Sequence, residues 1–334
     1  MSVGPAAELA GRRILVTGGS GFIGRHVVSE LTDAGAYVRV VDLQPHPDPD
    51  VEIVCGDIAE QDVLDVALEG GFDGVVHLAA VTSVLRSVEH PELTFRTNVA
   101  ATSALLQSAR AAGASALVFA STNAVTGSMD GAAITEATGL RPLTPYGATK
   151  AAAEMLMSAY TSAYGLRCAV LRLTNVYGTG MQAKDSIVAR LMRAIRLGLP
   201  FEIYGSGLGV RDYVHVADVL TAVRLGLDRE DWSGPTVIGA GRSMSVLEVV
   251  EAVRGVTGAA LDVFHGPARP GEMPAVIVDP ARAHAAGWSP RLSFEEGLVG
   301  VWAEWSRLDL DAVAASIGAV EVPGAPPAAT RAAM

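Results

Sequence analysis

Short hydrophobic runs alternate with amphipathic stretches along the first half of the chain. The runs predict strands at Arg13–Thr17, Tyr37–Asp42, Val51–Cys55, Gly74–Leu78, Ala116–Ser121 and Cys168–Arg172. Most of these runs are almost wholly apolar, as expected for strands that are covered on both faces of a sheet. The intervening spacing predicts helices at Gly21–Ala34, Leu93–Ala112 and Tyr146–Tyr164. Strand and helix in repetition predict an α/β fold of the Rossmann type, with a doubly wound parallel sheet.

The regular alternation of predicted strands and helices ends after about Val176. Further helices are predicted at Ser186–Leu197, at Ala217–Asp228 and from Val246, and short strands at Phe201–Tyr204, Arg211–His215, Thr236–Ile238 and Leu261–Phe264. We expect a first domain over residues 10–178 and a smaller C-terminal α/β lobe over 179–309, interleaved with the first. The Ala/Pro-rich segment 310–334 is expected to be a disordered tail.

Composition and charge narrow the class of protein. Half of the 334 residues are hydrophobic and 18% are charged, which excludes disorder for most of the chain. No run of eighteen apolar residues occurs and residues 1–13 lack a secretory pattern, so we expect no membrane contact and a cytoplasmic location. The formal charge of −11, without a basic run, argues against nucleic-acid binding.

A glycine-rich turn, TGGSGFIG, follows the first strand at residues 17–24. Gly18 permits a tight turn, Gly21 lets the backbone approach a pyrophosphate, and Gly24 lets the helix lie close to the sheet. Asp42 ends the second strand, at a spacing where a carboxylate accepts both ribose hydroxyls and repels a 2′-phosphate. The turn predicts NAD rather than NADP; the alternative is a glycine turn that serves packing alone.

An aspartate, two histidines and two cysteines outside the glycine turn each have a structural interpretation that must be weighed against a functional one. Asp57 follows the third strand and could bind the adenine amino group, or it could merely cap the next helix. His77 and His215 have no second His or Glu at metal-ligand spacing, so we expect packed histidines and no metal site. Two cysteines, Cys55 and Cys168, are too few for a disulfide framework or a zinc cluster and are expected to be buried.

Tyr146 and Lys150 lie four residues apart at the start of a predicted helix, and therefore on one face of it. An ammonium beside a phenol is expected to depress the tyrosine pKa and make it an acid/base near neutrality. The alternative is a surface pair of no consequence. Lys150 is one of only two lysines in the chain, the other being Lys184, which favours the functional interpretation.

These motifs resemble the extended short-chain dehydrogenase/reductases, and more closely the NAD-dependent sugar-nucleotide epimerase/dehydratase family. The resemblance covers about residues 12–305. It rests on TGGSGFIG at 17–24, HLAA at 77–80, STNAVTG at 121–127, YGATK at 146–150, LRLTNVYGTG at 171–180, YGSGLGVRDYVHVADV at 204–219 and ARPGE at 268–272.

The resemblance implies roles for particular residues. Thr122, Tyr146 and Lys150 would be catalytic, with Thr122 bridging the tyrosine and a sugar hydroxyl and Lys150 also holding the nicotinamide ribose. Cofactor positions would be Gly18, Gly21, Phe22, Ile23, Gly24, Asp42, Asp57, Ile58, Leu78, Ala79 and Ala80, together with Tyr146 and Lys150. Substrate positions would be Ser83, Thr122, Asn123, Tyr146, Asn175, Arg211 and Arg269. Arg211 and Arg269 would clamp the nucleotide diphosphate. The alternative for Arg211 is a salt bridge to Asp212, and the alternative for Arg269 is an exposed position in a loop.

Two departures from the family pattern bear on the reaction. The 4,6-dehydratases of the family usually carry Asp-Glu after the Ser/Thr, whereas this chain has Asn123-Ala124, which disfavours dehydration. Thr126 replaces the usual Tyr, which either reshapes the edge of the site or matters little.

The resemblance therefore implies an NAD-dependent 4-epimerase similar to the UDP-glucose 4-epimerases, with a nucleotide-hexose substrate (a UDP-sugar foremost) and a transient 4-keto intermediate. It also implies a homodimer. The alternatives are an NAD-dependent 4-ketoreductase or dehydrogenase and, below it, a dehydratase. A non-catalytic NAD-sensing protein ranks lower because Thr122, Tyr146 and Lys150 are all present.

Overall fold

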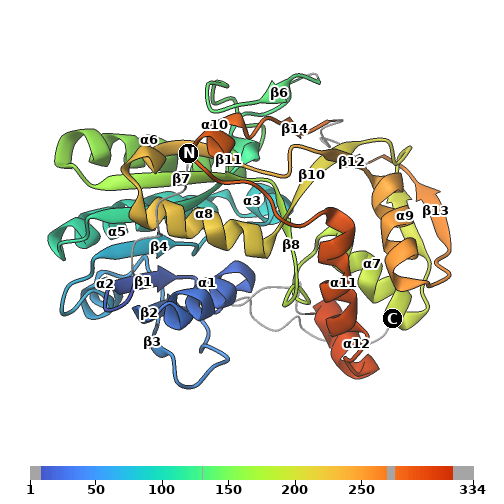
Figure 1. Ribbon diagram of the computed structural model, residues 1–334, viewed down its shortest axis with the longest axis horizontal. Coiled ribbons are helices and arrows are strands. Elements are labelled where there is room, and N and C mark those ends of the chain that lie inside the picture. Colours follow the sequence, from blue (N-terminus) through green and yellow to red (C-terminus); the bar gives the residue numbers. More distant parts are fainter. Residues whose placement is uncertain (1–8, 130, 269–274, 319–334) are drawn as a thin grey trace, which may run out of the picture.

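A seven-stranded parallel sheet forms the larger part of the structure, a computed structural model that describes residues 9–129, 131–268 and 275–318 (Figure 1). Its strands follow the order β11-β7-β5-β4-β1-β2-β3. Their bounds are Gly234–Ile238 (β11), Arg167–Leu173 (β7), Ala116–Thr122 (β5), Gly74–His77 (β4), Arg13–Thr17 (β1), Tyr37–Asp42 (β2) and Glu52–Cys55 (β3). The predicted strands of the first half are confirmed to within a residue at each end.

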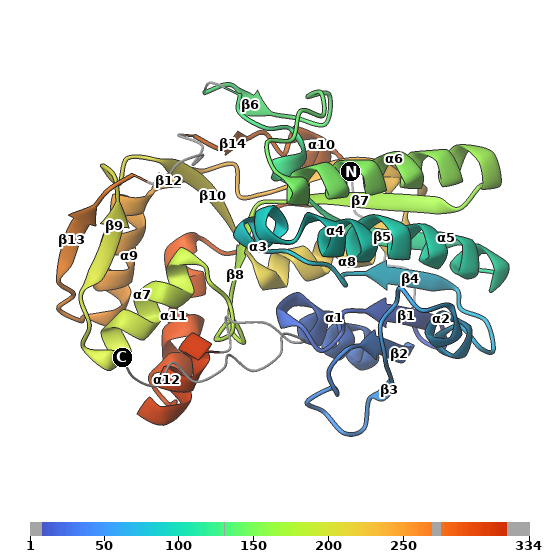
Figure 2. The same ribbon diagram turned by 180° about the vertical axis from the view of Figure 1, so that it is seen from behind.

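Helices cover both faces of this sheet, and the two views of the ribbon show one set each (Figures 1 and 2). One face carries α1 (Phe22–Asp33), α8 (Val216–Asp228) and α10 (Ala281–Ala285). The other carries α2 (Gln61–Ala67), α5 (Ala101–Ala111) and α6 (Pro145–Tyr164). The central strands β1, β4, β5 and β7 are thus covered on both faces, which explains their continuous apolar runs, whereas the edge strand β3 is partly exposed.

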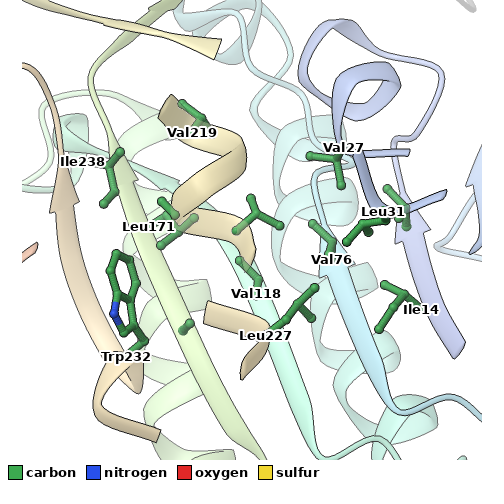
Figure 3. Packing of buried hydrophobic residues seen from close by; sticks show 14 of the residues in the cluster. Ile14, Val27, Leu31, Val76, Val118, Leu171, Val219, Leu227, Trp232 and Ile238 are labelled. Carbon is green, nitrogen blue, oxygen red and sulfur yellow. The ribbon is translucent and has the colours of Figure 1, made fainter. Parts of the chain in front are cut away.

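The core between the sheet and the α1/α8 layer is built from segments far apart in the sequence (Figure 3). The labelled side chains come from β1, α1, β4, β5, β7, α8, β11 and the short helix η3 (Glu230–Trp232). Leu171 and Leu227 are at most 1% exposed, and Trp232 closes the cluster at the β11 edge. Burial of side chains this large contributes about 1.5–3 kcal/mol each relative to exposure.

Residues 216–238 pack on the large sheet, although they come after the point near Val176 where the strand–helix alternation of the first half ends. β11 pairs in parallel with β7, placing Thr236 opposite Leu171. α8 packs across the same sheet, where its buried Val219 and Val223 join the core described above. A local apolar run does not specify which sheet its strand will join. Tertiary packing therefore decides that β11 and α8 belong to the large sheet and not to the smaller lobe.

The smaller lobe lies beside the sheet (Figures 1 and 2). Its strands are β8 (Asn175–Tyr177), β10 (Val210–His215) and β12 (Ser243–Ser245) in one small sheet, and β9 (Phe201–Tyr204) and β13 (Val263–Gly266) in another. Around them pack α7 (Ile187–Leu197), α9 (Val246–Thr257), α11 (Phe294–Trp305) and α12 (Leu310–Gly318). A two-stranded pair, β6 (Ala133–Ile134) and β14 (Ile277–Val278), joins the loop before α6 to a segment near the C-terminal end.

Helix α12 corrects the expectation of disorder from residue 310 onward. Val313 is fully buried in the core of the smaller lobe, and Ser316 accepts a hydrogen bond from Arg193 Nε on α7 at 3.0 Å. The apolar residues of α12 thus dock onto α7, a distant partner that local composition does not reveal. The rest of the expected tail, residues 319–334, lies outside the described residues.

Replacing Val313 by alanine tests this docking. Loss of two buried methyl groups is expected to lower the free energy of unfolding by about 1.5–3 kcal/mol, measured by urea denaturation. Leu310→Ala is the matched control, because Leu310 on the same helix is 54% exposed and its truncation should change stability by less than about 0.5 kcal/mol. Equal stability of both variants would contradict the docking of α12.

Candidate active site

The predicted site residues gather at the carboxyl ends of the parallel strands. Gly18 follows β1, Leu78 follows β4, and Thr122 ends β5, and these three strands are neighbours in the order β5-β4-β1. β1 lies where the chain reverses direction across the sheet, having β2 on one side and β4 on the other. Ligands of doubly wound folds bind in the crevice outside the strand ends at such a switch point.

In the glycine turn between β1 and α1, the backbone of neighbouring residues leaves no room for a side chain at Gly18 or Gly24. Gly18 has φ +73°, and a Cβ there would lie 2.6 Å from the Ala79 nitrogen. A Cβ on Gly24 would lie 2.1 Å from the Gly18 carbonyl oxygen. Gly21 differs, since it has φ −73° and an added Cβ would meet only the Gly18 oxygen, at 3.3 Å. The chain therefore constrains position 21 much less than positions 18 and 24.

Asp42 is held at the rim of this turn. Its carboxylate accepts hydrogen bonds from the backbone N–H of Ser20 and of Gln44, each at 3.0 Å. A carboxylate fixed beside the N-terminal end of α1 suits a ribose and repels a 2′-phosphate. The turn and Asp42 together fit NAD.

Asp57 forms local contacts next to β3. Its carboxylate accepts from the Ala59 N–H at 2.9 Å and pairs with Arg96 at 3.1 Å. The capping alternative is wrong, because α2 begins later and Glu60 is its N-cap residue. Ile58 is buried in the core, while Phe22, Ile23, Leu78, Ala79 and Ala80 are all partly buried around the turn.

The end of β5 anchors the start of α6. The Thr122 hydroxyl is hydrogen-bonded to the Tyr146 side chain. The preceding residue of β5, Ser121, donates a hydrogen bond from its hydroxyl to Glu154 at 2.5 Å. The Ala120 carbonyl accepts from Lys150 Nζ at 2.8 Å. The structure therefore brings Thr122, Tyr146 and Lys150 together as predicted from their motifs.

Helix α6 begins at a defined place because several groups fix its first turn. The Thr144 hydroxyl caps the helix by accepting from the Gly147 N–H at 3.2 Å, and Pro145 occupies the first helical position. The Ser87 hydroxyl accepts from the Tyr146 N–H at 3.1 Å. A Cβ on Gly147 would lie 2.6 Å from the Ala124 carbonyl oxygen, so glycine lets α6 pack directly on the turn after β5.

The expected depression of the Tyr146 pKa by Lys150 is wrong. Burial raises the pKa of Tyr146 to about 12, opposed only in part by its hydrogen bond with Thr122. Lys150 is fully enclosed, and its ammonium lies 4.5 Å from the centre of the Phe119 ring. Burial lowers the pKa of Lys150 to about 7, against the attraction of Glu154. The sequence shows only that the two residues share a helical face. In the folded chain, burial is the largest influence on the pKa of both Tyr146 and Lys150.

Asn98 is a buried residue of the site that the motifs did not single out. It lies in a π-helical turn, Arg96–Ala100, that interrupts the helix expected over Leu93–Ala112. Its side chain exchanges two hydrogen bonds with the Val81 backbone and donates to the Thr149 hydroxyl at 3.1 Å. Thr149 in turn donates to the Tyr146 carbonyl at 2.9 Å. A polar residue at a buried position of a predicted helix is the signal that could have revealed it.

The predicted substrate residues are less closely grouped. Ser83 is exposed and caps α3 (Val84–Glu89). Asn123 begins the short turn η2 (Asn123–Val125) beside Thr122. Asn175 donates to the Asp212 carbonyl at 2.9 Å, and Arg211 lies on the paired strand β10. Arg269 lies outside the described residues.

The alternative salt bridge from Arg211 to Asp212 is not favoured by the environment of Asp212. Its fully buried carboxylate accepts from the Thr174 hydroxyl at 2.9 Å and from the Ala240 N–H at 2.8 Å. The Arg211 side chain instead donates from Nη1 to the Val210 carbonyl at 2.9 Å.

Thr126 is buried and donates to the Asn123 carbonyl at 2.8 Å, so it closes the turn after β5 instead of shaping the edge of the site. Cys168 is buried as expected, but Cys55 is exposed.

Both histidines are packed, as predicted. His77 is hydrogen-bonded to Thr17 at 2.7 Å and Thr102 at 2.8 Å, and burial lowers its pKa to about 3. His215 caps α8 by accepting from the Ala217 N–H at 3.2 Å. Across the described ranges, no group of three or more His, Cys, Asp or Glu side chains could hold a metal ion. In the same ranges, no helix combines the length and the apolar character needed to cross a bilayer.

Comparison with known proteins relates this geometry to a family. A model of the NAD dependent epimerase/dehydratase family matches residues 14–239. The chain is 32% identical over 340 residues to a UDP-glucose 4-epimerase of Azospirillum brasilense, covering 94% of this chain and 97% of the relative. It is 34% identical over 314 residues to a dTDP-glucose 4,6-dehydratase of Streptomyces niveus, covering 88% and 93%.

A solved structure extends the likeness to the whole fold. The Thermus thermophilus UDP-glucose 4-epimerase in complex with NAD has a TM-score of 0.83 and 35% identity to this chain, covering 88% of this chain and 99% of that one. The Rossmann-type α/β fold class expected from the sequence is confirmed.

Two glycine-to-alanine variants separate chain packing from ligand approach. Gly24→Ala is expected to lower the free energy of unfolding by about 1–3 kcal/mol, because the new Cβ collides with backbone. Gly21→Ala should change stability by less than about 1 kcal/mol yet weaken NAD binding about tenfold or more, measured by calorimetry. Gly255→Ala on α9 is the control, since its Cβ would meet nothing within 4 Å. Full NAD affinity in Gly21→Ala would contradict the assignment of this turn to the pyrophosphate.

Proposed function

The chain belongs to the NAD dependent epimerase/dehydratase family, as its motifs predicted, and we propose that it interconverts the C4 epimers of a nucleotide-diphosphate hexose, foremost a UDP-sugar. The observation that carries the proposal is the packing of Thr122, Tyr146 and Lys150 at the end of β5, with Asn123 and Ala124 following. The Azospirillum brasilense relative and the Thermus thermophilus structure named above support a 4-epimerase.

Proton transfer at the substrate 4-hydroxyl falls to Tyr146, with Thr122 as its hydrogen-bonding partner. When bound, NAD+ would supply the hydride chemistry at C4. Because the phenol alone holds its proton up to a pKa of about 12, its activation needs positive charge nearby. The Lys150 ammonium would supply that charge, together with the positive charge of the nicotinamide when NAD+ is bound.

The cofactor would be held by the backbone of the glycine turn and by polar side chains around it. The N–H groups at the start of α1 would bind the pyrophosphate, and Gly21 would leave it room to approach. Asp42 would accept the ribose hydroxyls, and Lys150 would bind the second ribose. An adenine contact by Asp57 remains part of the proposal.

The smaller lobe would hold the nucleotide diphosphate. Asn175 and Arg211 lie on paired strands, with Tyr213 of β10 opposite Asn175 of β8. A guanidinium pairs two phosphate oxygens at once, which suits Arg211 and, by its motif, Arg269. Ser83 and Asn123 would contact the sugar. The division into an NAD-binding domain at residues 10–178 and a mainly substrate-binding lobe at 179–309 is part of this proposal.

Dehydration is the competing reaction within the family, and the Streptomyces niveus relative bears that name. Loss of water needs an acid and a base beside the 4-keto sugar. Asn123 is an amide and Ala124 has no proton to transfer, so these two positions cannot supply them. A 4-ketoreductase or dehydrogenase would use the same three catalytic residues but exchange NAD(H) with solvent.

A homodimer in the cytoplasm completes the proposal. On α6, Leu156 and Tyr160 pack inward, while Met155 is 67% and Tyr164 is 55% exposed. The exposed apolar side chains offer a surface that a second copy would cover. The cytoplasm is a reducing compartment, which agrees with Cys55 and Cys168 being free cysteines.

Tyr146→Phe is expected to lower kcat by roughly 10²–10⁴-fold while NAD affinity stays within about threefold of the unmodified protein. The loss follows from removal of the proton-transferring hydroxyl without a change of ring volume. Tyr160→Phe on the same helix is the control and should keep the original kcat. Undiminished turnover by Tyr146→Phe, measured on any substrate that the protein accepts, would refute the role of Tyr146.

The reaction itself is tested by proton NMR. The protein is incubated with UDP-glucose, UDP-galactose, their N-acetyl forms and UDP-glucuronate, at substoichiometric NAD+, while absorbance at 340 nm is followed. Inversion at C4 with many turnovers per NAD and no lasting NADH is the expected outcome. Product limited by the added NAD, with NADH rising in proportion, would replace the epimerase by a dehydrogenase. A 4-keto-6-deoxy product would identify a dehydratase.

A further inference from the structure

Three residues spaced by four form a column along α6. Tyr146 and Lys150 are assigned roles above, and Glu154 continues the same helical face one turn further. Glu154 is only 7% exposed, which is rare for a carboxylate unless it is paired. The proposed reaction gives Glu154 no task, and no motif drew attention to it.

Glu154 is bound from two strands of the large sheet. On β5, the Ser121 hydroxyl donates to Oε1 at 2.5 Å. On β7, Arg172 donates from Nε to both carboxylate oxygens at 3.1 and 3.2 Å and from Nη2 to Oε2 at 2.8 Å. The Arg172 and Glu154 side chains are 4% and 6% exposed, so water does not screen this ion pair.

The environment of Lys150 contains little else that stabilises a positive charge. β5 contributes the Phe119 ring and the Ala120 carbonyl, and α6 contributes the neutral Tyr146 phenol. From β4, His77 faces it, and burial keeps this imidazole neutral. The carboxylate of Glu154 is the charge that favours the ammonium, and it opposes the lowering of the Lys150 pKa by burial.

We propose that Glu154 is a positioning residue of the active site, whose buried carboxylate keeps Lys150 in its ammonium form while its bond to Ser121 fixes the strand end that carries Thr122. The significance for catalysis rests on the proposed function, because the ammonium matters there for holding the ribose and activating Tyr146. The electrostatic part concerns Lys150 alone and requires no substrate.

Arg172 determines how much of the Glu154 charge Lys150 experiences. The guanidinium shares the carboxylate and partly neutralises it, and its Nη1 donates to the Thr135 and Glu136 carbonyls of the loop before α6 at 3.4 Å. Removing either partner breaks the same ion pair, yet the effects on Lys150 have opposite signs. Without Glu154, the Lys150 ammonium loses the negative charge that stabilises it. Without Arg172, the Glu154 carboxylate is no longer partly neutralised and stabilises the ammonium more strongly.

The two lysines of the chain make this measurable by NMR. Lysine labelled with ¹³C at Cε gives two signals, and Lys184→Arg leaves that of Lys150 alone. In this background, the Lys150 pKa is read from the ¹³Cε shift between pH 5.5 and 9.5. Glu154→Gln should lower the pKa by one unit or more, a tenfold rise in the acid dissociation constant, and Arg172→Gln should raise it. Glu251→Gln is the control, since it removes an exposed carboxylate that pairs with Arg254 on α9 in the smaller lobe and should leave the Lys150 pKa unchanged.

A merely structural role predicts a different result. Shifts of the same sign in Glu154→Gln and Arg172→Gln, or a Lys150 pKa in Glu154→Gln within 0.3 of the starting protein, would overturn the proposal. A single variant leaves one buried charge without its partner, which can prevent folding. In that case the double variant Glu154→Gln/Arg172→Gln, which removes both charges, is used for the test. It should still lower the Lys150 pKa, and an unchanged value would likewise refute the proposal.

A kinetic arm connects the result to catalysis. If the ammonium is the active form, turnover falls as pH rises through the Lys150 pKa, and in Glu154→Gln this fall should occur at least one pH unit lower. Glu154→Asp retains the charge and should restore the original profile. A shifted NMR titration without catalysis of any sugar would leave the coupling intact and refute only the proposed function. An altered titration with an unaltered pH profile of turnover would refute the catalytic consequence.

Discussion

The packing of helix α6 against the end of strand β5 is the contact on which the site depends. Three consecutive strand residues, Ala120, Ser121 and Thr122, each bind a different residue of the helix. Strand residues are about 3.3 Å apart, and a helix rises about 6 Å over four residues, so only a close and well-defined crossing can satisfy all three bonds. Gly147 provides the close approach. The positions of a phenol, an ammonium and a hydroxyl thus follow from one helix–strand contact.

This contact is largely removed from water, and burial sets the chemistry of the groups within it. It holds Tyr146 in its neutral form and weakens the preference of Lys150 for its charged form. Uncompensated charges in such a place are strongly unfavourable, which explains why Glu154 and Arg172 lie directly behind Lys150 as a paired unit. Catalytic groups with displaced pKa values can respond to the charge of a bound cofactor, which an exposed tyrosine and lysine could not do to the same degree.

The sheet order connects the two halves of the site. β1 and β4 frame the glycine turn, β5 carries the hydroxyl, and β7 supplies the arginine of the buried pair before continuing toward β8 and the smaller lobe. Helix α8 and strand β11 then return to the large sheet, so the chain passes between the lobes more than once. These crossings connect the two lobes, and Asn175 lies just beyond the carboxyl end of β7, on a strand paired with the one that carries Arg211.

The sequence by itself determined the strands, the glycine turn with Asp42, and the Tyr146/Lys150 pair, because these depend on local periodicity and on residue types whose spacing has a direct structural meaning. It also indicated the family and the fold, through motifs spread over most of the chain. Tertiary structure alone decided that β11 joins the large sheet, that α12 docks on α7, that Asn98 bridges to α6, and that the Tyr146 pKa is raised instead of lowered. Each of these depends on burial or on a partner distant in sequence, and neither quantity is encoded in the local pattern.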